Sequence, residues 1–110
     1  MSKQICFEYE GKDYTLEYTR NTVRQMERSG FVADDISSKP MTVLPDLFAG
    51  AFLANHAQLK RTKIDKIYSE MGNKKNLIAA LTEMYNDTIE TLLDEPEKNV
   101  SWTPNWESES

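Results

Sequence analysis

The sequence ICFEYEGKDYTLEY occupies residues 5–18 and decides how the fold begins. Apolar and polar side chains alternate over residues 5–9 and again over residues 14–18. A period of two places each apolar set on one face of a strand, and Glu10-Gly11-Lys12 supplies a turn in which glycine can adopt positive φ. The stretch predicts a β-hairpin, whose apolar face needs a helix or further strands against it because two strands alone are marginal in water.

Helices are expected after the hairpin, because apolar residues recur at helical spacing and because capping or helix-terminating residues stand at the ends of these segments. Their limits are Thr19 or Thr22 to Gly30, Met41 or Pro45 to Asn55, Thr62 to Gly72, and Asn73 to Pro96. Pro45 is acceptable only in a first helical turn, and residues 31–39 form a connecting loop. The expected fold class is α+β: an N-terminal β-hairpin followed by about four α-helices packed as a small helical domain, with a disordered acidic C-terminal tail.

Charge divides the chain into a body and a tail. Residues 94–110 carry five acids and one base, a net charge of −4, and the whole chain carries −5. Because the end of the chain is polar, acidic and aperiodic, we expect a single domain over residues 1–96 and a flexible tail over residues 97–110. A near-neutral body with an acidic tail lacks the basic face that nucleic-acid binding requires.

Several features predict a cytoplasmic protein. The single cysteine cannot form an internal disulfide, which favours a reducing compartment. Residues 1–4 lead into the hairpin without an apolar signal segment. The longest apolar run, residues 47–54, is far shorter than the roughly 20 residues of a membrane span, so we expect no membrane contact.

Residue types that support catalysis or metal binding are scarce. Cys6 and His56 are each the only one of their kind, so a zinc site would need many carboxylates, and a nucleophile pair is less expected than a buried structural thiol. His56 is interpreted as a residue near a helix C-terminus whose ring N–H meets free carbonyls. Asp34-Asp35 and Asp94-Glu95 lack calcium-loop spacing. The sequence predicts no catalytic, cofactor-binding or metal-binding residue, and a protein that is not an enzyme.

The second expected helix is apolar on all sides between Leu47 and Ala54, which is typical of a central helix or of a contact with another chain. The candidate client or self-association surface consists of Leu47, Phe48, Ala51 and Phe52. Phe48 and Phe52 are four residues apart and share a face, and Gly50 allows close approach. The alternative is a core position, which we favour for Leu47, Ala51 and Leu53 and hold equally open for the two phenylalanines.

Two tryptophans, Trp102 and Trp106, stand in the acidic, proline-containing tail. Exposed tryptophans are costly and are favoured as anchors for partner proteins, so both are candidate tail anchors. The alternative is that one or both fold back over the hairpin or a helix groove.

Three segments of the chain resemble a family of small phage proteins. They are YTLEYTRNTVRQME at residues 14–27, LFAGAFLANH at residues 47–56, and the pattern from Leu77-Ile78 through Glu83-Met84-Tyr85 to Glu90-Thr91-Leu92-Leu93-Asp94-Glu95-Pro96. The pattern is similar to that of the tail assembly chaperones of long-tailed phages and prophages of Gram-positive bacteria. The resemblance covers about residues 5–96 and contains no catalytic motif.

The resemblance implies a non-catalytic protein that binds the tape measure protein stoichiometrically while the phage tail is assembled. It implies action in the cytoplasm of the bacterial host and absence from the mature virion. In many such phages a ribosomal frameshift extends the chaperone, and the extension recruits the tail tube protein. A homo-oligomer is also expected, because an unpaired edge of the hairpin invites pairing with another copy.

A second possible function belongs to a different class, that of regulatory proteins. The chain would then be a phage-encoded protein that inhibits a host protein through the Trp102 and Trp106 tail. Deletion of residues 97–110 separates the two functions, since the chaperone should keep most of its client binding and the inhibitor should lose its binding completely.

Overall fold

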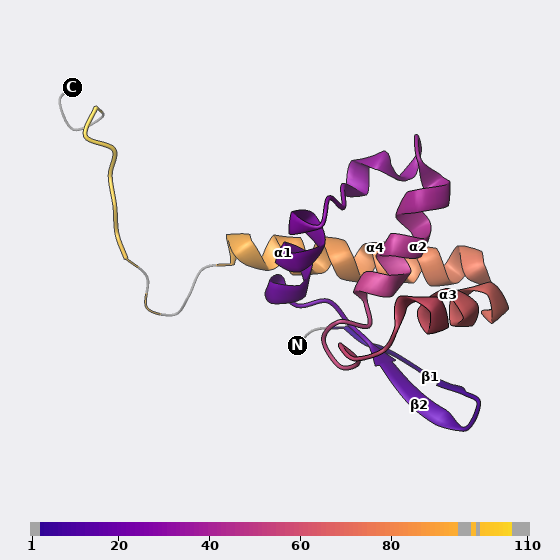
Figure 1. Cartoon of the computed structure of the whole chain (residues 1–110). Helices are drawn as coiled ribbons and strands as arrows, with labels where there is room; N and C mark the ends of the chain where they lie inside the picture. The colour runs from indigo at the N-terminus through magenta and orange to yellow at the C-terminus, as the bar shows by residue number, and fades with distance from the viewer. Residues whose placement is uncertain (1–2, 95–97, 99, 107–110) are drawn as a thin grey trace.

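The computed structural model describes residues 3–94, 98 and 100–106, and Figure 1 shows the order of its helices and strands. They are β1 (Ile5–Tyr9), β2 (Lys12–Leu16), α1 (Arg20–Arg28), the 3₁₀ helix η1 (Ala33–Ile36), α2 (Pro40–Gly50), α3 (Arg61–Glu70), α4 (Lys74–Glu90) and the 3₁₀ helix η2 (Thr91–Leu93). The predicted class, a β-hairpin followed by four α-helices in the described part of the chain, is confirmed.

The hairpin forms as predicted from its alternation and its turn. β1 and β2 pair antiparallel with Phe7 opposite Tyr14, and their rings stack with centroids 5.5 Å apart. Glu10 and Gly11 have φ values of 52° and 78°. Positive φ at both central residues is the mark of the two-residue turns whose twist matches that of the flanking strands.

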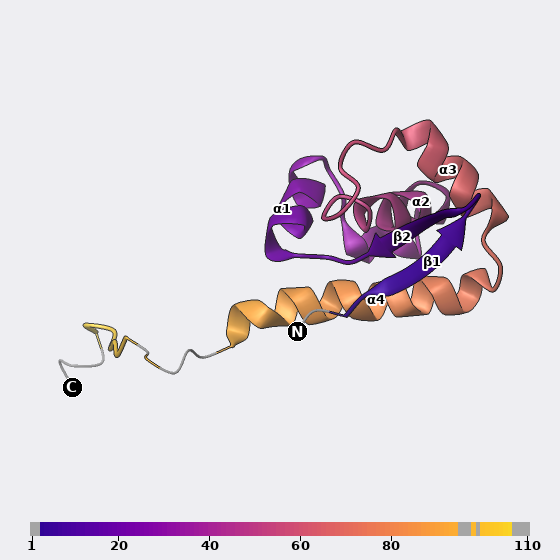
Figure 2. The same ribbon diagram turned by 90° about the horizontal axis from the view of Figure 1, so that it is seen from below.

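One cluster of buried apolar side chains joins the hairpin to the helices. Leu16 from β2, Phe48 from α2, Ile67 from α3 and Leu81 from α4 are all 0% exposed. In the view of Figure 2, the long α4 runs along the edge of the body, and the hairpin, α1, α2 and α3 all lie on the same side of α4. The helices therefore cover the apolar face that the hairpin could not bury alone.

Groups from the turn after α2 occupy the outer edge of β2. The Glu17 N–H donates to the Ala51 carbonyl at 3.1 Å, the Thr15 N–H donates to Nε2 of His56 at 3.0 Å, and Nδ2 of Asn55 donates to the Thr15 carbonyl at 3.3 Å. These bonds within the chain occupy the β2 edge at Thr15 and Glu17, so another copy cannot pair with those backbone groups, and association through the hairpin stays a prediction.

The second helix is shifted toward the N-terminus relative to its prediction. α2 begins at Pro40 and ends at Gly50, so Pro45 lies inside the helix rather than in its first turn. Residues 51–55 form turns instead of helix. The predicted loop at residues 31–39 contains the short helix η1. Proline at the first helical position suits Pro40, since its missing N–H has no partner there.

Both ends of α1 form as the sequence predicted, but the start of α3 differs from its prediction. Thr19 and Thr22 form a reciprocal capping box before α1, and Gly30 after it has φ 98°. Thr62 is not a cap, because α3 follows Lys60 and has no side-chain cap. Asn73 precedes α4 as predicted, but in a left-handed conformation and without a side-chain cap bond.

Removal of the α1 cap provides a local test. Thr19→Ala deletes the hydroxyl that accepts the Thr22 N–H at 3.1 Å, so we expect it to lower the free energy of unfolding by about 1 kcal/mol. Thr62→Ala is the matched control, since its hydroxyl caps nothing, and it should change stability by less than about 0.5 kcal/mol. Urea denaturation of both variants checks this, and equal losses would contradict the assignment of Thr19 as the cap.

The described part of the tail, residues 98 and 100–106, contains no helix or strand. The other residues of the predicted disordered tail, together with Glu95 and Pro96, lie outside the described residues. Among the described residues, no helix is both long enough and apolar enough to cross a membrane.

Candidate binding groove

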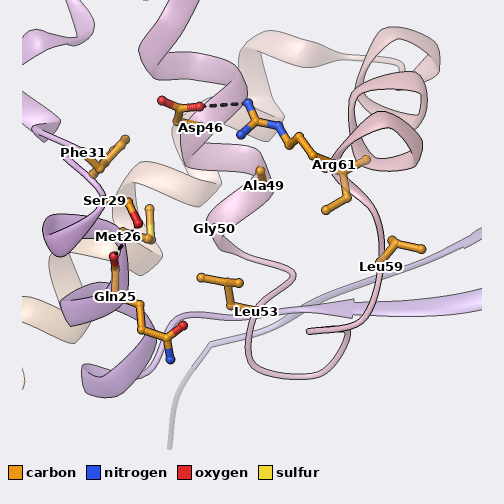
Figure 3. Close-up of a pocket in the computed structure, with 11 residues that line it drawn as sticks. Gln25, Met26, Ser29, Phe31, Asp46, Ala49, Gly50, Leu53, Leu59 and Arg61 are labelled. Carbon is orange, nitrogen blue, oxygen red and sulfur yellow. Dashed lines mark hydrogen bonds and ion pairs between the residues drawn. The ribbon is translucent and has the colours of Figure 1, made fainter.

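A groove with a cavity of about 400 Å³ opens between α1, the second half of α2, the turn that follows α2, and the start of α3. Its floor is apolar and consists of Met26, Phe31, Ala49, Gly50, Leu53 and Ile64, and Leu59 also lines it. Figure 3 shows the α1 side chains on one side, Arg61 and Leu59 on the other, and Ala49 and Gly50 between them. The volume lies within the usual range for ligand pockets, roughly 300–1,000 Å³.

A glycine on α2 lets α1 pack closely against it beside the groove. A Cβ atom added to Gly50 would lie 2.4 Å from Sδ of Met26, closer than van der Waals contact permits. Gly50 therefore allows close approach, as predicted, and the partner that approaches it is α1 of the same chain. Ala49, one residue earlier, is partly exposed in the floor.

A fixed ion-pair network borders the groove. The Arg61 guanidinium lies 2.8 Å from an Asp46 carboxylate oxygen and 2.9 Å from one of Asp65, and Figure 3 marks the first contact. Burial would lower the pKa of Arg61, but its hydrogen bonds to Asp65 and Asp46 outweigh burial and raise that pKa. Pairs this exposed add little stability, so their effect is to hold a polar rim beside an apolar floor.

The four residues named as a candidate client or self-association surface are buried, so the alternative of a core position, favoured for Leu47 and Ala51 and held open for Phe48 and Phe52, is the one observed. Leu47, Phe48, Ala51 and Phe52 are at most 1% exposed and belong to the core. The Phe48 ring lies 5.0 Å from that of Phe52 and 5.1 Å from that of Tyr68. The hairpin, α3 and α4 cover this face, which leaves the opposite one, with Ala49, Gly50 and Leu53, for the groove.

Sequence reasoning missed the groove residues contributed by α1, the turn and α3. Met26 was predicted to face inward, Leu53 was favoured as a core position, and Leu59 received no role. The only signal for the groove was the adjacent small pair Ala49-Gly50, and it became informative only once Met26 was known to contact Gly50.

The tail tryptophans do not lie in the groove or against the hairpin. Trp102 is 78% exposed and Trp106 is 75% exposed. The expectation that they fold back is therefore wrong for this structure, and the anchor interpretation stays a prediction.

Cys6 is exposed, so the expected buried structural thiol is wrong. Its sulfur lies 3.8 Å from Oγ1 of Thr15, on the side of the hairpin that faces away from the core. Among the described residues, no group of three or more His, Cys, Asp or Glu side chains could hold a metal ion. Asp34 and Asp35 lie in η1, and Glu95 of the second acidic pair lies outside the described residues.

His56 has a structural role that differs from the expected one. Its Nε2 accepts the Thr15 N–H at 3.0 Å, so the ring accepts a hydrogen bond there instead of donating to a helix carbonyl. This bond requires an unprotonated Nε2. Burial, with a smaller contribution from the charge of Lys12, lowers the pKa of His56.

The lowered pKa of His56 predicts a stability change with pH. A group whose pKa falls on folding contributes stability that is present above its unfolded pKa, about 6.5, and is lost as the pH drops through its folded pKa. We expect the free energy of unfolding to decrease from neutral pH toward about pH 5, as measured by denaturant titration. His56 is the only histidine, so His56→Ala should flatten this slope, and an unchanged slope would contradict the assignment.

Comparison with known proteins finds a family for the chain. No curated protein and no solved structure matches the chain significantly. A family described as a domain of unknown function, DUF5055, matches residues 1–106. Because this match spans nearly the whole sequence, including the hairpin, all four α-helices of the described part and both tail tryptophans, the chain belongs to the DUF5055 family.

Proposed function

We propose that the chain is a phage tail assembly chaperone that binds the tape measure protein stoichiometrically, without catalysis, during tail assembly. The groove between α1, α2 and α3 is the observation that carries the proposal, because it combines an open apolar floor with a polar rim. The resemblance of residues 5–96 to such chaperones supplies the identity of the client. Action in the host cytoplasm and association with other copies are parts of the same proposal.

The groove suits an amphipathic helix as its occupant. Helix-in-groove recognition places apolar side chains at positions i, i+3, i+4 and i+7 into an apolar channel. The floor contributes Met26, Leu53 and Ile64 for such contacts, and the small side chain of Ala49, which is partly exposed, leaves room for a client helix beside α2. Asp46 and Arg61 on the rim can meet the polar flank of that helix.

Co-expression with the tape measure protein encoded beside this chain tests the proposal. We expect the tape measure protein to stay soluble and to co-purify with the chain at a fixed ratio. A tape measure protein that precipitates while this chain remains folded and free would contradict chaperone activity of this form. A frameshift-extended form should then be tested for binding of both the tape measure and tail tube proteins.

A second function is supported by a separate observation, the exposure of Trp102 and Trp106. In it the chain is a regulatory protein that inhibits a host protein through these two anchors. Deletion of residues 97–110 distinguishes the functions, because an inhibitor of this kind would lose all binding and the chaperone would keep its client. The double variant Trp102→Ala, Trp106→Ala is the control that preserves tail length and charge.

A further inference from the structure

Two further cavities adjoin the groove on the side of the hairpin. One, of about 430 Å³, opens between the hairpin turn and the start of α3, and the other, of about 310 Å³, lies next to it along residues 55–59. Because Lys12, Tyr14, Gln58 and Leu59 line both cavities, the two form one continuous cleft, the basic cleft. Leu59 also lines the groove, so the basic cleft and the groove meet at this residue.

We propose that the basic cleft binds an acidic segment of the client, adjacent in the client sequence to the amphipathic helix that occupies the groove. The inference rests on the proposed function, since it names the chemistry of a second part of the same client. A peptide that leaves the groove past Leu59 enters the basic cleft directly, so one continuous client segment can occupy both sites.

Two lysines of the basic cleft are available to a carboxylate. Lys12 and Lys60 are exposed, and neither forms an ion pair within the described part of the chain. The third lysine, Lys63, lies 2.7 Å from a carboxylate oxygen of Glu10, the only acid among the described residues that line the cleft. Three lysines against one glutamate leave the cleft with a net charge of +2 when His56 is neutral.

Tyrosine rings hold two of these lysines in place. Nζ of Lys12 lies 5.7 Å from the centroid of the Tyr14 ring, and Nζ of Lys63 lies 5.1 Å from that of Tyr9. Tyr14 is buried, and the Tyr9 hydroxyl donates to Glu70 at 2.7 Å, so neighbouring groups fix both rings. A contact with a ring face leaves the N–H donors of an ammonium group free. Lys12 can therefore donate to an incoming carboxylate.

The surroundings of the basic cleft add to its positive charge. Burial lowers the pKa of His56, and the charge of Lys12 lowers this pKa further, which shows that the field of Lys12 extends along the cleft. α3 begins beside the cleft with no side-chain cap and no acid in its first turn, and the free N–H groups of such a helix start carry a partial positive charge. A segment rich in carboxylates has the complementary charge.

A nucleic acid fits the basic cleft less well than an acidic peptide does. Nucleic-acid binding draws its affinity from many phosphate contacts, whereas the cleft offers only two lysines without an ion-pair partner in the described part of the chain, Lys12 and Lys60. A short acidic segment needs no more than these two, because the apolar floor of the adjoining groove supplies the rest of the affinity for the same client.

Binding of matched peptides tests the inference. The probes are a peptide of one amphipathic helix of the tape measure protein, extended at either end by a short run of glutamates, and the same peptides extended by glutamines. We expect one of the glutamate peptides to bind the full chain about fivefold or more tightly than its glutamine counterpart at low ionic strength, because two exposed charge pairs form. High salt should reduce this preference. Fluorescence anisotropy measures both affinities.

Charge reversal at both free lysines should remove the preference. We expect the Lys12→Glu, Lys60→Glu double variant to bind the glutamate peptide no more tightly than the glutamine peptide. The Lys39→Glu, Lys75→Glu double variant is the charge-matched control, since both lysines are exposed and line neither the groove nor the cleft. It should keep the preference, which separates binding in the cleft from stabilisation of the client helix by its own glutamates. Both double variants should unfold cooperatively.

The outcomes distinguish the inference from the proposed function. Equal affinity of the unmodified chain for the glutamate and glutamine peptides would overturn the inference alone, whereas failure of every peptide to bind would overturn both. A preference that persists in the Lys12→Glu, Lys60→Glu variant would also overturn the inference. So would a single-stranded oligonucleotide that binds through these lysines more tightly than the glutamate peptide does, since the cleft would then recognise phosphate groups.

Discussion

A Phe48→Ala variant is expected to lose about 3–5 kcal/mol of folding free energy. The Phe48 side chain is 0% exposed and packs between the rings of Phe52 and Tyr68, so truncation removes its burial and leaves a cavity among rigid neighbours. A domain of this kind has a total stability of about 5–15 kcal/mol. Guanidinium denaturation followed by far-UV circular dichroism measures the loss.

Leu92→Ala is the control for this prediction. Leu92 lies in η2 and is 67% exposed, and its truncation should change the free energy of unfolding by no more than about 0.5 kcal/mol. An equal loss in free energy of unfolding for Phe48→Ala and Leu92→Ala would contradict the core position of Phe48 and would support the client-surface prediction.

A Leu53→Glu variant is expected to lower the affinity for a tape measure helix by at least about 30-fold, which corresponds to roughly 2 kcal/mol. Leu53 is partly exposed in the groove floor, so a glutamate there can extend its carboxylate into the open groove when no client is bound. A bound client would desolvate that charge next to apolar side chains, which is unfavourable. Fluorescence anisotropy of a labelled client peptide measures the affinity.

Leu93→Glu matches this substitution in residue type and charge at a position that is 83% exposed and outside the groove. It should leave client affinity within twofold of the unmodified chain, and both variants should unfold cooperatively. Equal affinity of the Leu53→Glu and Leu93→Glu variants for the client would contradict the assignment of the groove as the binding site.

Local patterns predicted the elements of the fold. The alternation on either side of Glu10-Gly11 determines both strands and their turn, since a two-residue turn with positive φ sets the register. The apolar stripe of α4, with Leu77, Leu81 and Met84 buried, needed no information from elsewhere in the chain. These features depend on neighbours within a few residues.

The face of α2 that would be buried could not be predicted in this way. Because this helix is apolar on all sides, its sequence contains no preference for one side. The choice is made by residues distant in sequence, such as Tyr14 and Tyr68, whose rings contact Phe52 and Phe48. The four residues named as a candidate client surface therefore lie on the buried side of this segment.

The misassigned roles of Cys6 and His56 have similar explanations. The alternation that turns Ile5 and Phe7 inward turns Cys6 outward, and the general tendency of free cysteine to be buried was given more weight than this local pattern. The His56 bond to Thr15 spans 41 positions, so nothing near His56 in the sequence signals it. The groove is likewise assembled from three helices and a turn.

Nuclear magnetic resonance mapping of the client contact tests the groove assignment most directly. The isotope-labelled full chain is titrated with a peptide that covers one amphipathic helix of the tape measure protein. We predict saturable shifts of the Met26, Ala49, Leu53 and Leu59 methyl signals, with the Leu92 methyls unaffected. Saturable shifts confined to other surfaces, such as the exposed side of β1, would contradict the groove as the client site, as would no shifts in a chain that co-purifies with the whole tape measure protein.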